Sequence, residues 1–185
     1  MRVIIAAAGT AGHINPGLAI ANKIQEKEKN SEIMFIGTPR GLENDLVPRA
    51  GYKLKTIEAY GLSKEISITN LKKICKTLSA TGKARKIIKE FKPDIIVGAG
   101  GYICGPVVWA GKKEKIPVVL HESNAFPGKA VKMLAPKADK ILISFEEARN
   151  RIPKAKKIVF TGTPVKIKKK DYTLEQKEKI LKEIG

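Results

Sequence analysis

Short, uninterrupted runs of apolar residues recur along the chain and alternate with stretches of helical periodicity. Strands that are apolar at every position are typical of a parallel sheet that helices cover on both faces. The pattern therefore predicts an α/β fold over residues 1–164, with a doubly wound, mostly parallel, Rossmann-like sheet. The runs that predict strands are 3–8, 33–36, 95–97, 117–120, 141–143 and 158–160.

Residues 165–185 have a different pattern, with a run of lysines at 168–170 followed by a highly charged helical stretch. Thr173 and Gln176 have the spacing of a capping box, which predicts a helix that begins after Thr173. We therefore expect one domain over residues 1–164 and a basic linker with a terminal helix over residues 165–185.

The first predicted strand ends in a loop with glycines at both ends, Gly9 and Gly12, and His13 follows it. Asn15 is a good N-cap residue and Pro16 suits a first helical turn, so we expect a helix to begin at this point. Glycines let backbone amides approach a ligand, and a helix N-terminus carries partial positive charge. The loop therefore predicts a cradle for an anion.

A second glycine-rich loop, residues 98–106, follows the strand predicted at 95–97. One such loop is more often a tight turn, but two at the carboxyl ends of strands indicate a crevice for phosphate groups at a topological switch point. Neither loop matches GxGxxG, and the chain has no Walker A sequence, so dinucleotide and P-loop sites are disfavoured.

A third loop brings an imidazole, a carboxylate and an amide together in His121, Glu122 and Asn124, after the strand predicted at 117–120. The only other histidine, His13, lies at the same predicted edge of the sheet. Histidine suits proton transfer near neutral pH, which favours a functional role for both. The alternatives are a capping or solvated role for each histidine and a turn-stabilising role for Glu122.

The chain carries 36 Lys and Arg against 18 Asp and Glu, a formal net charge of +18. Such a charge favours polyanions, namely nucleic acid, an anionic lipid surface or a phosphorylated ligand. The sequence has no helix-turn-helix or RNP pattern, so we expect no nucleic acid partner. Cys75 and Cys104 lack any metal-ligand spacing and the chain has no DxD pair, so we expect neither a metal nor a cofactor. Two lone thiols suit a reducing cytoplasm.

A basic amphipathic stretch within residues 71–78 predicts contact with a membrane surface. Its apolar residues have the spacing i, i+3, i+4, i+7, and lysines flank them. The alternative is that the stripe packs on the sheet while the lysines are solvated; we expect Ile87, Ile88 and Phe91 to make the main core contact. The predicted membrane contacts are Leu71, Lys72, Lys73, Ile74, Lys76 and Leu78.

Four motifs, in this order, resemble those of the MurG family of peptidoglycan glycosyltransferases, which transfer N-acetylglucosamine from UDP-N-acetylglucosamine to lipid I. They are residues 9–19, 100–106, 121–124 and 162–166. The sequence departs from the family pattern at Ala8, Ala11, Ser123, Thr163 and Lys166. The resemblance implies the N-terminal domain of an inverting, metal-independent GT-B enzyme with an undecaprenyl-diphosphate-linked acceptor.

The resemblance also implies roles for individual residues. His13 is the candidate base, with Glu122 or His121 orienting it or the sugar. Residues expected to contact the donor are Thr10, Ala11, Gly12, Asn124 and Lys166. Residues expected to contact the acceptor or its diphosphate are Gly9, Gly100, Gly101, Tyr102, Gly105 and His121.

Complete members of the family carry a second Rossmann-like domain that supplies most of the donor pocket, and we expect that donor domain to be absent here. The chain would then be the acceptor- and membrane-binding half of the transferase, peripheral at the cytoplasmic face of the cell membrane. Its expected partners are UDP-N-acetylglucosamine, lipid I, an anionic membrane surface and a C-terminal donor domain or partner subunit. The alternative is a subunit of a split transferase, or a stand-alone lipid-diphosphate-binding module without catalysis of its own.

Overall fold

The computed structural model describes residues 1–60, 68–165 and 172–184, with no side-chain description for residues 68–78 and 184. In this part of the chain seven strands form a single sheet in the order β3-β2-β1-β4-β5-β6-β7, and every neighbouring pair is parallel. This confirms the predicted doubly wound α/β fold. The strands are β1 (Arg2–Ala7), β2 (Glu32–Gly37), β3 (Lys53–Thr56), β4 (Ile95–Gly100), β5 (Val118–Glu122), β6 (Lys140–Ile143) and β7 (Ile158–Phe160).

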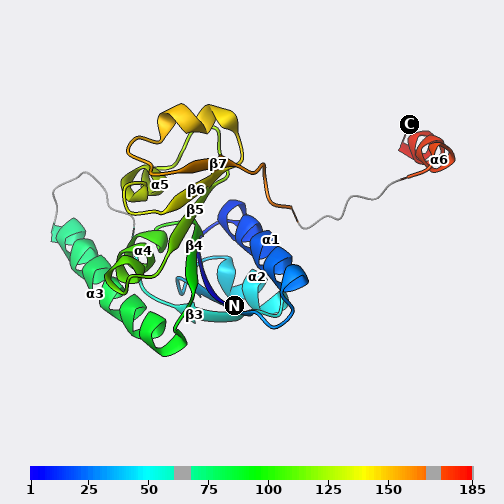
Figure 1. Ribbon diagram of the computed structural model, residues 1–185. Helices are drawn as coiled ribbons and strands as arrows, with labels where there is room; N and C mark the ends of the chain where they lie inside the picture. The colour runs from blue at the N-terminus through cyan, green and yellow to red at the C-terminus, as the bar shows by residue number, and fades with distance from the viewer. Residues whose placement is uncertain (61–67, 166–171, 185) are drawn as a thin grey trace.

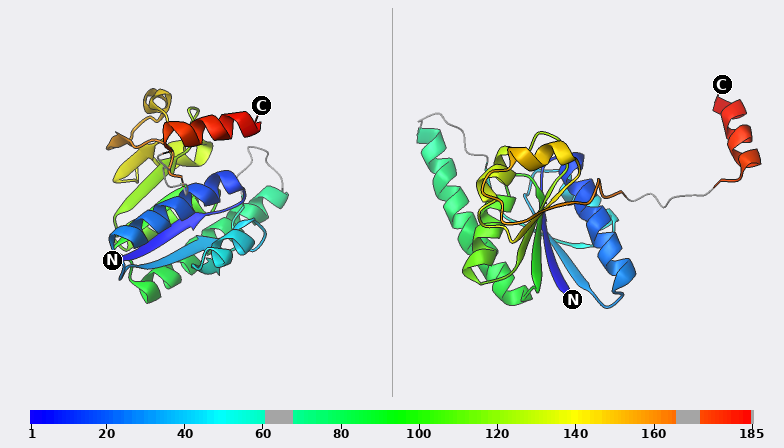
Figure 2. Two further views of the ribbon diagram at one scale, coloured as in Figure 1. Left: turned by 90° about the vertical axis from the view of Figure 1, so that its right-hand side faces the viewer. Right: turned by 45° about the horizontal axis from the view of Figure 1, so that its top comes forward.

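Helices cover the two faces of the sheet (Figure 1). One face packs against α1 (Ala11–Lys27) and α2 (Glu43–Arg49), and the other against α3 (Ile68–Phe91), α4 (Cys104–Lys113) and α5 (Lys129–Leu134). Figure 2 shows the sheet between these two layers. A 3₁₀ helix, η1 (Glu146–Arg151), precedes β7, and α6 (Leu174–Ile184) is the last described helix.

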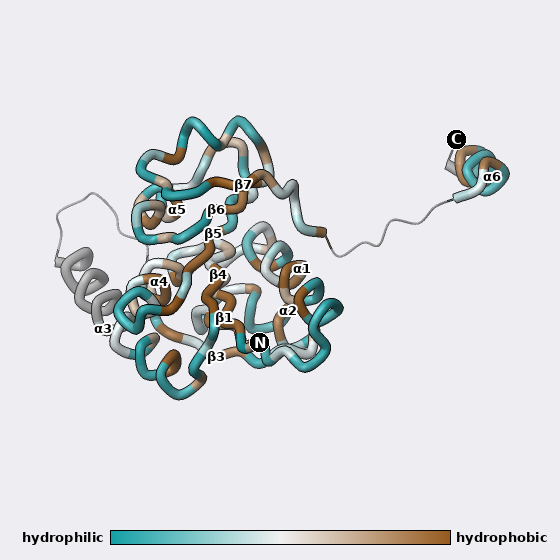
Figure 3. The backbone as a smooth tube through the Cα atoms, viewed as in Figure 1, coloured by the Kyte–Doolittle hydropathy of each residue, from teal (hydrophilic) through white to brown (hydrophobic). Residues whose placement is uncertain are grey.

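The central strands are apolar at successive positions because each face of the sheet has its own core. Ile4 belongs to the cluster under α3, α4 and α5, whereas Ile5 belongs to the cluster under α1 and α2. Both side chains are fully buried. In Figure 3, which colours the backbone by hydropathy, β1 and β4 in the middle of the fold are accordingly brown, the colour of hydrophobic residues.

The edge strand β3 was not among the strands that the apolar runs predicted. Its Lys53, Lys55 and Thr56 are exposed, and only Leu54 is half-buried. An edge strand with one side facing water needs no continuous apolar run, so the pattern that revealed the other strands missed this one.

The predicted start of the first helix was wrong. Thr10 is extended and α1 begins at Ala11, so Asn15 and Pro16 lie inside the helix. Proline removes the amide that would bond to the carbonyl of Gly12, but Gly12 is exposed in the first turn, where water can satisfy that carbonyl. A proline this close to the N-terminus is therefore compatible with a continuous helix.

Helix α3 packs on the sheet through Ala80, Ala84 and Ile88, which are buried, while Ile87 and Phe91 are partly buried against the same cluster. This confirms the predicted core contact of Ile87, Ile88 and Phe91. The predicted membrane contacts between Leu71 and Leu78 also lie in α3, but their side chains are outside the described part. Among the described residues, no helix is both long and apolar enough to cross a bilayer.

The capping box predicted at the start of α6 is present. The amide of Thr173 donates to Gln176 Oε1 at 3.1 Å, and the amide of Gln176 donates to Thr173 Oγ1 at 3.3 Å. These reciprocal bonds satisfy two amides that the helix itself leaves without acceptors. The linker residues 166–171, including Lys166, lie outside the described residues.

Candidate functional site

The order of the strands along the sheet reverses between β1 and β4, and the loops after these two strands touch. The amide of Ala8 donates to the carbonyl of Gly100 at 3.2 Å. Gly101 has a φ of +86°, and a Cβ built on it would lie 2.4 Å from the carbonyl oxygen of Ala8. Only glycine allows this approach, so the two loops that the sequence singled out form one continuous surface at the switch point.

His13 lies where these loops meet, in the first turn of α1. Its Nδ1 is 3.1 Å from the carbonyl oxygen of Ala8. A Cβ on Gly100 would come within 2.2 Å of His13 Cδ2, so the ring rests directly on that glycine. Because a carbonyl oxygen only accepts, Nδ1 carries the hydrogen, and in the neutral ring Nε2 then has the lone pair. The half-buried ring thus has the tautomer of a general base.

The two helix N-termini at this edge differ in what they offer an anion. In α1 the amides of His13 and Ile14 bond back to Thr10, and the helix has no acceptors for the amides of its first two residues, Ala11 and Gly12. In α4 the amides of Cys104 and Gly105 donate to the carbonyls of the preceding turn. The N-terminus of α1 is therefore the better anion site of the two.

Glu43, the first residue of α2, is a fully buried carboxylate that sequence reasoning missed. It accepts hydrogen bonds from the amide of Gly9, the amide of Thr38 and the hydroxyl of Thr38 at 2.9, 2.7 and 2.7 Å. Burial alone would raise the pKa of this carboxyl, but the hydrogen bonds outweigh burial and hold the pKa below its ordinary value. The amide of Gly9, expected to contact the acceptor diphosphate, is thus already bonded to Glu43. The signal in the sequence was the pair Gly37 and Gly41, because glycines around a loop carboxylate leave room for it to be buried.

Among the described residues, Glu122 makes no hydrogen bond to His13 and bonds instead within its own loop. Its Oε1 accepts from the amide and the side chain of Asn124, both at 2.9 Å, and its Oε2 accepts from the amide of Gly128 at 2.8 Å. The carboxylate is buried and shapes the loop after β5, which is the turn-stabilising role. Asn124 remains exposed at this edge of the sheet.

His121 is 1% exposed and lies on the α1 face of the sheet. Its Nδ1 is 3.4 Å from Ser123 Oγ and its Nε2 is 3.3 Å from Ser144 Oγ. Burial lowers the pKa of His121 from 6.5 to about 4, so the ring is neutral at physiological pH. A buried neutral imidazole is a poor ligand for a diphosphate. It instead lines a pocket of about 300 Å³ between α1 and the segment after β7.

Four more of the predicted site residues lie at the same edge of the sheet. Thr10 and Gly12 are exposed, and Tyr102 is 66% exposed. Gly105 is half-buried, and a Cβ built on it would meet only open space. These positions are accessible to a ligand at the switch point.

The chain matches the family model described as the glycosyltransferase family 28 N-terminal domain over residues 3–143. Relatives from Acetivibrio thermocellus and Thermoanaerobacter sp. are 45% and 43% identical over 98% and 100% of the chain, which covers 49% and 50% of their lengths. Both are named UDP-N-acetylglucosamine–N-acetylmuramyl-(pentapeptide) pyrophosphoryl-undecaprenol N-acetylglucosamine transferase. The chain thus spans about half the length of these curated relatives.

Among solved structures, Acinetobacter baumannii MurG is 31% identical with a TM-score of 0.72, and the match covers 86% of this chain and 45% of that one. The UDP-GlcNAc 2-epimerase from Neisseria meningitidis bound to UDP-GlcNAc has a TM-score of 0.64 at 17% identity, with coverage of 88% and 46%. This second likeness concerns the fold alone.

Proposed function

Because this chain belongs to the glycosyltransferase family 28 N-terminal domain family, we propose that it is the acceptor-side half of an inverting N-acetylglucosaminyltransferase that converts lipid I to lipid II. The observation that carries the proposal is His13, whose ring lies at the contact between the two glycine loops with Nδ1 bonded to the carbonyl of Ala8. The names of the curated relatives supply the substrates, UDP-N-acetylglucosamine and the undecaprenyl-diphosphate-linked acceptor.

His13 acts as the general base in this proposal. Nε2 takes the proton from the acceptor hydroxyl as that oxygen attacks the anomeric carbon of the donor sugar, while UDP departs with the bonding electrons. The amides of Ala11 and Gly12 lie at the positive end of α1, where they bind a diphosphate. A positioned base contributes roughly 10²- to 10⁴-fold to such a step.

The donor is held mainly by a second domain in this proposal. From this chain Thr10 and Asn124 reach the donor from the exposed edge of the sheet, and Lys166 is a further contact. Ala11 and Gly12 border both the donor and the acceptor diphosphate. We assign residues 1–164 to the acceptor-side domain and residues 165–185 to the linker and terminal helix. The donor-binding part is then a C-terminal domain or a partner subunit.

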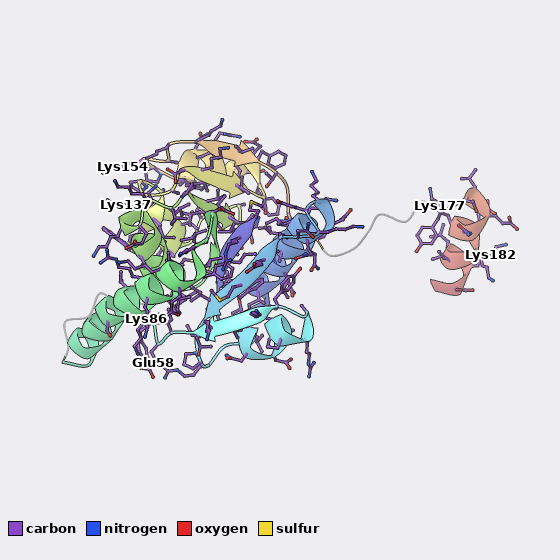
Figure 4. All side chains as sticks on the ribbon, turned by 60° about the horizontal axis from the view of Figure 1, so that its bottom comes forward. Glu58, Lys86, Lys137, Lys154, Lys177 and Lys182 are labelled. Atoms are coloured by element: carbon purple, nitrogen blue, oxygen red, sulfur yellow. The ribbon has the colours of Figure 1, made fainter. Side chains whose placement is uncertain are left out.

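We also propose peripheral binding to the cytoplasmic face of an anionic membrane. Trp109 on α4 is 45% exposed, and the Lys137 ammonium lies 4.8 Å from its ring centre. Lys86 on α3 and Lys137 extend from the same side of the molecule (Figure 4). An exposed indole beside lysines suits the interface of an anionic bilayer. Helix α3, which includes the basic stretch of residues 71–78, lies on this side of the molecule.

Acceptor binding tests the proposal on this chain directly. We expect the chain to bind nanodiscs that contain lipid I more tightly than nanodiscs with undecaprenyl phosphate, and to bind UDP-N-acetylglucosamine only weakly. Gly12→Asp should weaken the lipid I-dependent part, because it sets a carboxylate at the N-terminus of α1 beside the diphosphate.

Gly82→Asp is the matched control, since Gly82 is an exposed glycine on α3 where a Cβ meets only open space. It makes the same change of charge and should leave the preference for lipid I intact. Equal binding to both kinds of nanodisc would overturn the acceptor assignment. Micromolar affinity for UDP-N-acetylglucosamine alone would show that the donor site lies in this chain.

A further inference from the structure

Glu43 and His13 are connected through one peptide group, the bond between Ala8 and Gly9. The N–H of this group, on Gly9, donates to Glu43 Oε2 at 2.9 Å. The C=O of the same group, on Ala8, accepts from His13 Nδ1 at 3.1 Å. The bond is trans, so its N–H and C=O point in opposite directions, with the carboxylate at one end and the imidazole at the other.

The fold makes room for this carboxylate at the expense of other side chains. A Cβ on Gly37 would lie 2.5 Å from Glu43 Cγ, and a Cβ on Gly41 would lie 1.9 Å from Glu43 Oε2. Among the described residues no cation forms an ion pair with Glu43, so its charge is balanced by the N–H and O–H groups of Gly9 and Thr38. A buried charge without a cation lowers the stability of the fold relative to an apolar side chain of similar size. Packing alone therefore does not explain a glutamate at this position.

Glu43 also fixes the turn that precedes α1. Gly9 has a φ of +96°, and its carbonyl accepts from the amide of Leu42 at 3.2 Å. The Gly9 residue is therefore held on both sides by the N-terminal region of α2. This fixes the plane of the Ala8–Gly9 peptide, and with it the direction in which the carbonyl of Ala8 faces His13.

We propose that Glu43 is a positioning residue for His13 that acts through the Ala8–Gly9 peptide group. A carboxylate that accepts from the N–H polarises the peptide and makes its carbonyl a stronger acceptor, as in chains of hydrogen bonds generally. The stronger acceptor holds the hydrogen of His13 on Nδ1 and leaves Nε2 free. The catalytic meaning of this tautomer rests on the proposed function, whereas the connection itself does not.

The tautomer of His13 is measurable in the chain without any ligand, by ¹⁵N NMR of the imidazole ring. We expect the wild type to show hydrogen on Nδ1. Glu43→Gln keeps the shape of the side chain but removes the charge, so the ratio of tautomers should shift toward Nε2–H by about 10-fold and the amide of Gly9 should exchange about 10- to 100-fold faster. Glu43→Asp keeps the charge on a shorter side chain and should fall between the two.

Two further variants separate positioning from loss of stability. Asp45→Asn removes an exposed acid from the first turn of the same helix, where Asp45 pairs with Arg49 at 2.8 Å, and should leave both readouts unchanged. Thr38→Val removes one hydrogen bond from Glu43 Oε1 but leaves the bond to Gly9, so it should lower stability without moving the tautomer. If Glu43→Gln does not fold, Glu43→Asp is compared with Thr38→Val.

A wild-type tautomer in the folded Glu43 variant would overturn the proposal. The same follows if Thr38→Val shifts the tautomer as far as the Glu43 variant does, because general loosening would then explain the effect. Neither measurement uses a sugar nucleotide or a lipid, so a failure of the proposed transferase activity would leave this result standing.

Discussion

The buried imidazole of His121 should make the stability of the fold depend on pH between about 6.5 and 4. In the folded state burial holds the pKa of His121 at about 4, whereas the ordinary value is 6.5. Between these values the unfolded chain binds a proton that the folded chain does not, so stability falls as the pH falls. Above pH 6.5 both states are neutral at this ring and the contribution to stability is complete.

The size of the effect follows from the same two values. Each pH step of one unit within this window costs about 1.4 kcal/mol, so lowering the pH from 7.5 to 5 should remove about 2 kcal/mol from the free energy of unfolding. The buried carboxylate of Glu43 has a lowered pKa, so its contribution is present above its ordinary value of 4.5 and is lost only at lower pH. His121 is therefore a main source of the change above pH 5.

Urea denaturation at a series of pH values measures this loss directly. His121→Gln removes the titrating ring but keeps an amide that can reach Ser144, so it should be less stable at pH 7.5 and should lose about 2 kcal/mol less on acidification to pH 5. The chain has only two histidines, so an NMR titration can follow the His121 ring itself. Parallel pH profiles for wild type and variant, or a His121 ring that titrates near 6.5, would refute the reasoning.

Two further predictions concern the loop contact and the membrane. Gly101→Ala should destabilise the chain by about 2 kcal/mol or more, because the new Cβ meets the Ala8 carbonyl at a positive φ. Gly82→Ala, in exposed helix, should stabilise it by up to about 1 kcal/mol, and thermal unfolding that ranks the two alike would contradict this. Charge reversal in the basic stretch should release the chain from anionic vesicles in a co-sedimentation assay, with little change in Tm; unchanged sedimentation would show that the stretch does not contact lipid. The positions reversed to Glu are Lys72, Lys73 and Lys76.

The fold was predictable where one physical requirement dominates the sequence. Strands buried on both faces must be apolar throughout, and in the described part of the chain these runs located every strand except β3, whose exposed Lys53 and Lys55 need no such pattern. The start of α1 was not predictable from local preferences, because Asn15 and Pro16 favour a later start. The start of the helix is set by the backbone at Gly9 and Thr10. Gly9 has a positive φ, Thr10 is extended, and the helix begins at the next residue.

The candidate site divides in the same way. Glycine loops at the carboxyl ends of strands predicted where a ligand site would form, since parallel topology brings those ends to one edge. The partners of individual side chains were not predictable, because they depend on distant segments. Glu43 lies 34 residues from the Gly9 amide that it binds. His121 and Glu122 are adjacent in sequence, but successive strand positions point to opposite faces, so the two side chains form hydrogen bonds with different partners.

The most direct test of the account is sugar transfer by this chain joined to a donor domain. The chain would be fused to the C-terminal half of the Acetivibrio thermocellus relative, and transfer of labelled N-acetylglucosamine from its UDP derivative to lipid I would be measured. We expect no transfer by the unfused chain, transfer by the fusion, and a kcat lowered by roughly 10²- to 10⁴-fold in the fusion with His13→Ala, with KM for lipid I nearly unchanged. A folded fusion that transfers no sugar while the intact relative does, or a His13→Ala fusion with wild-type kcat and KM, would contradict the account.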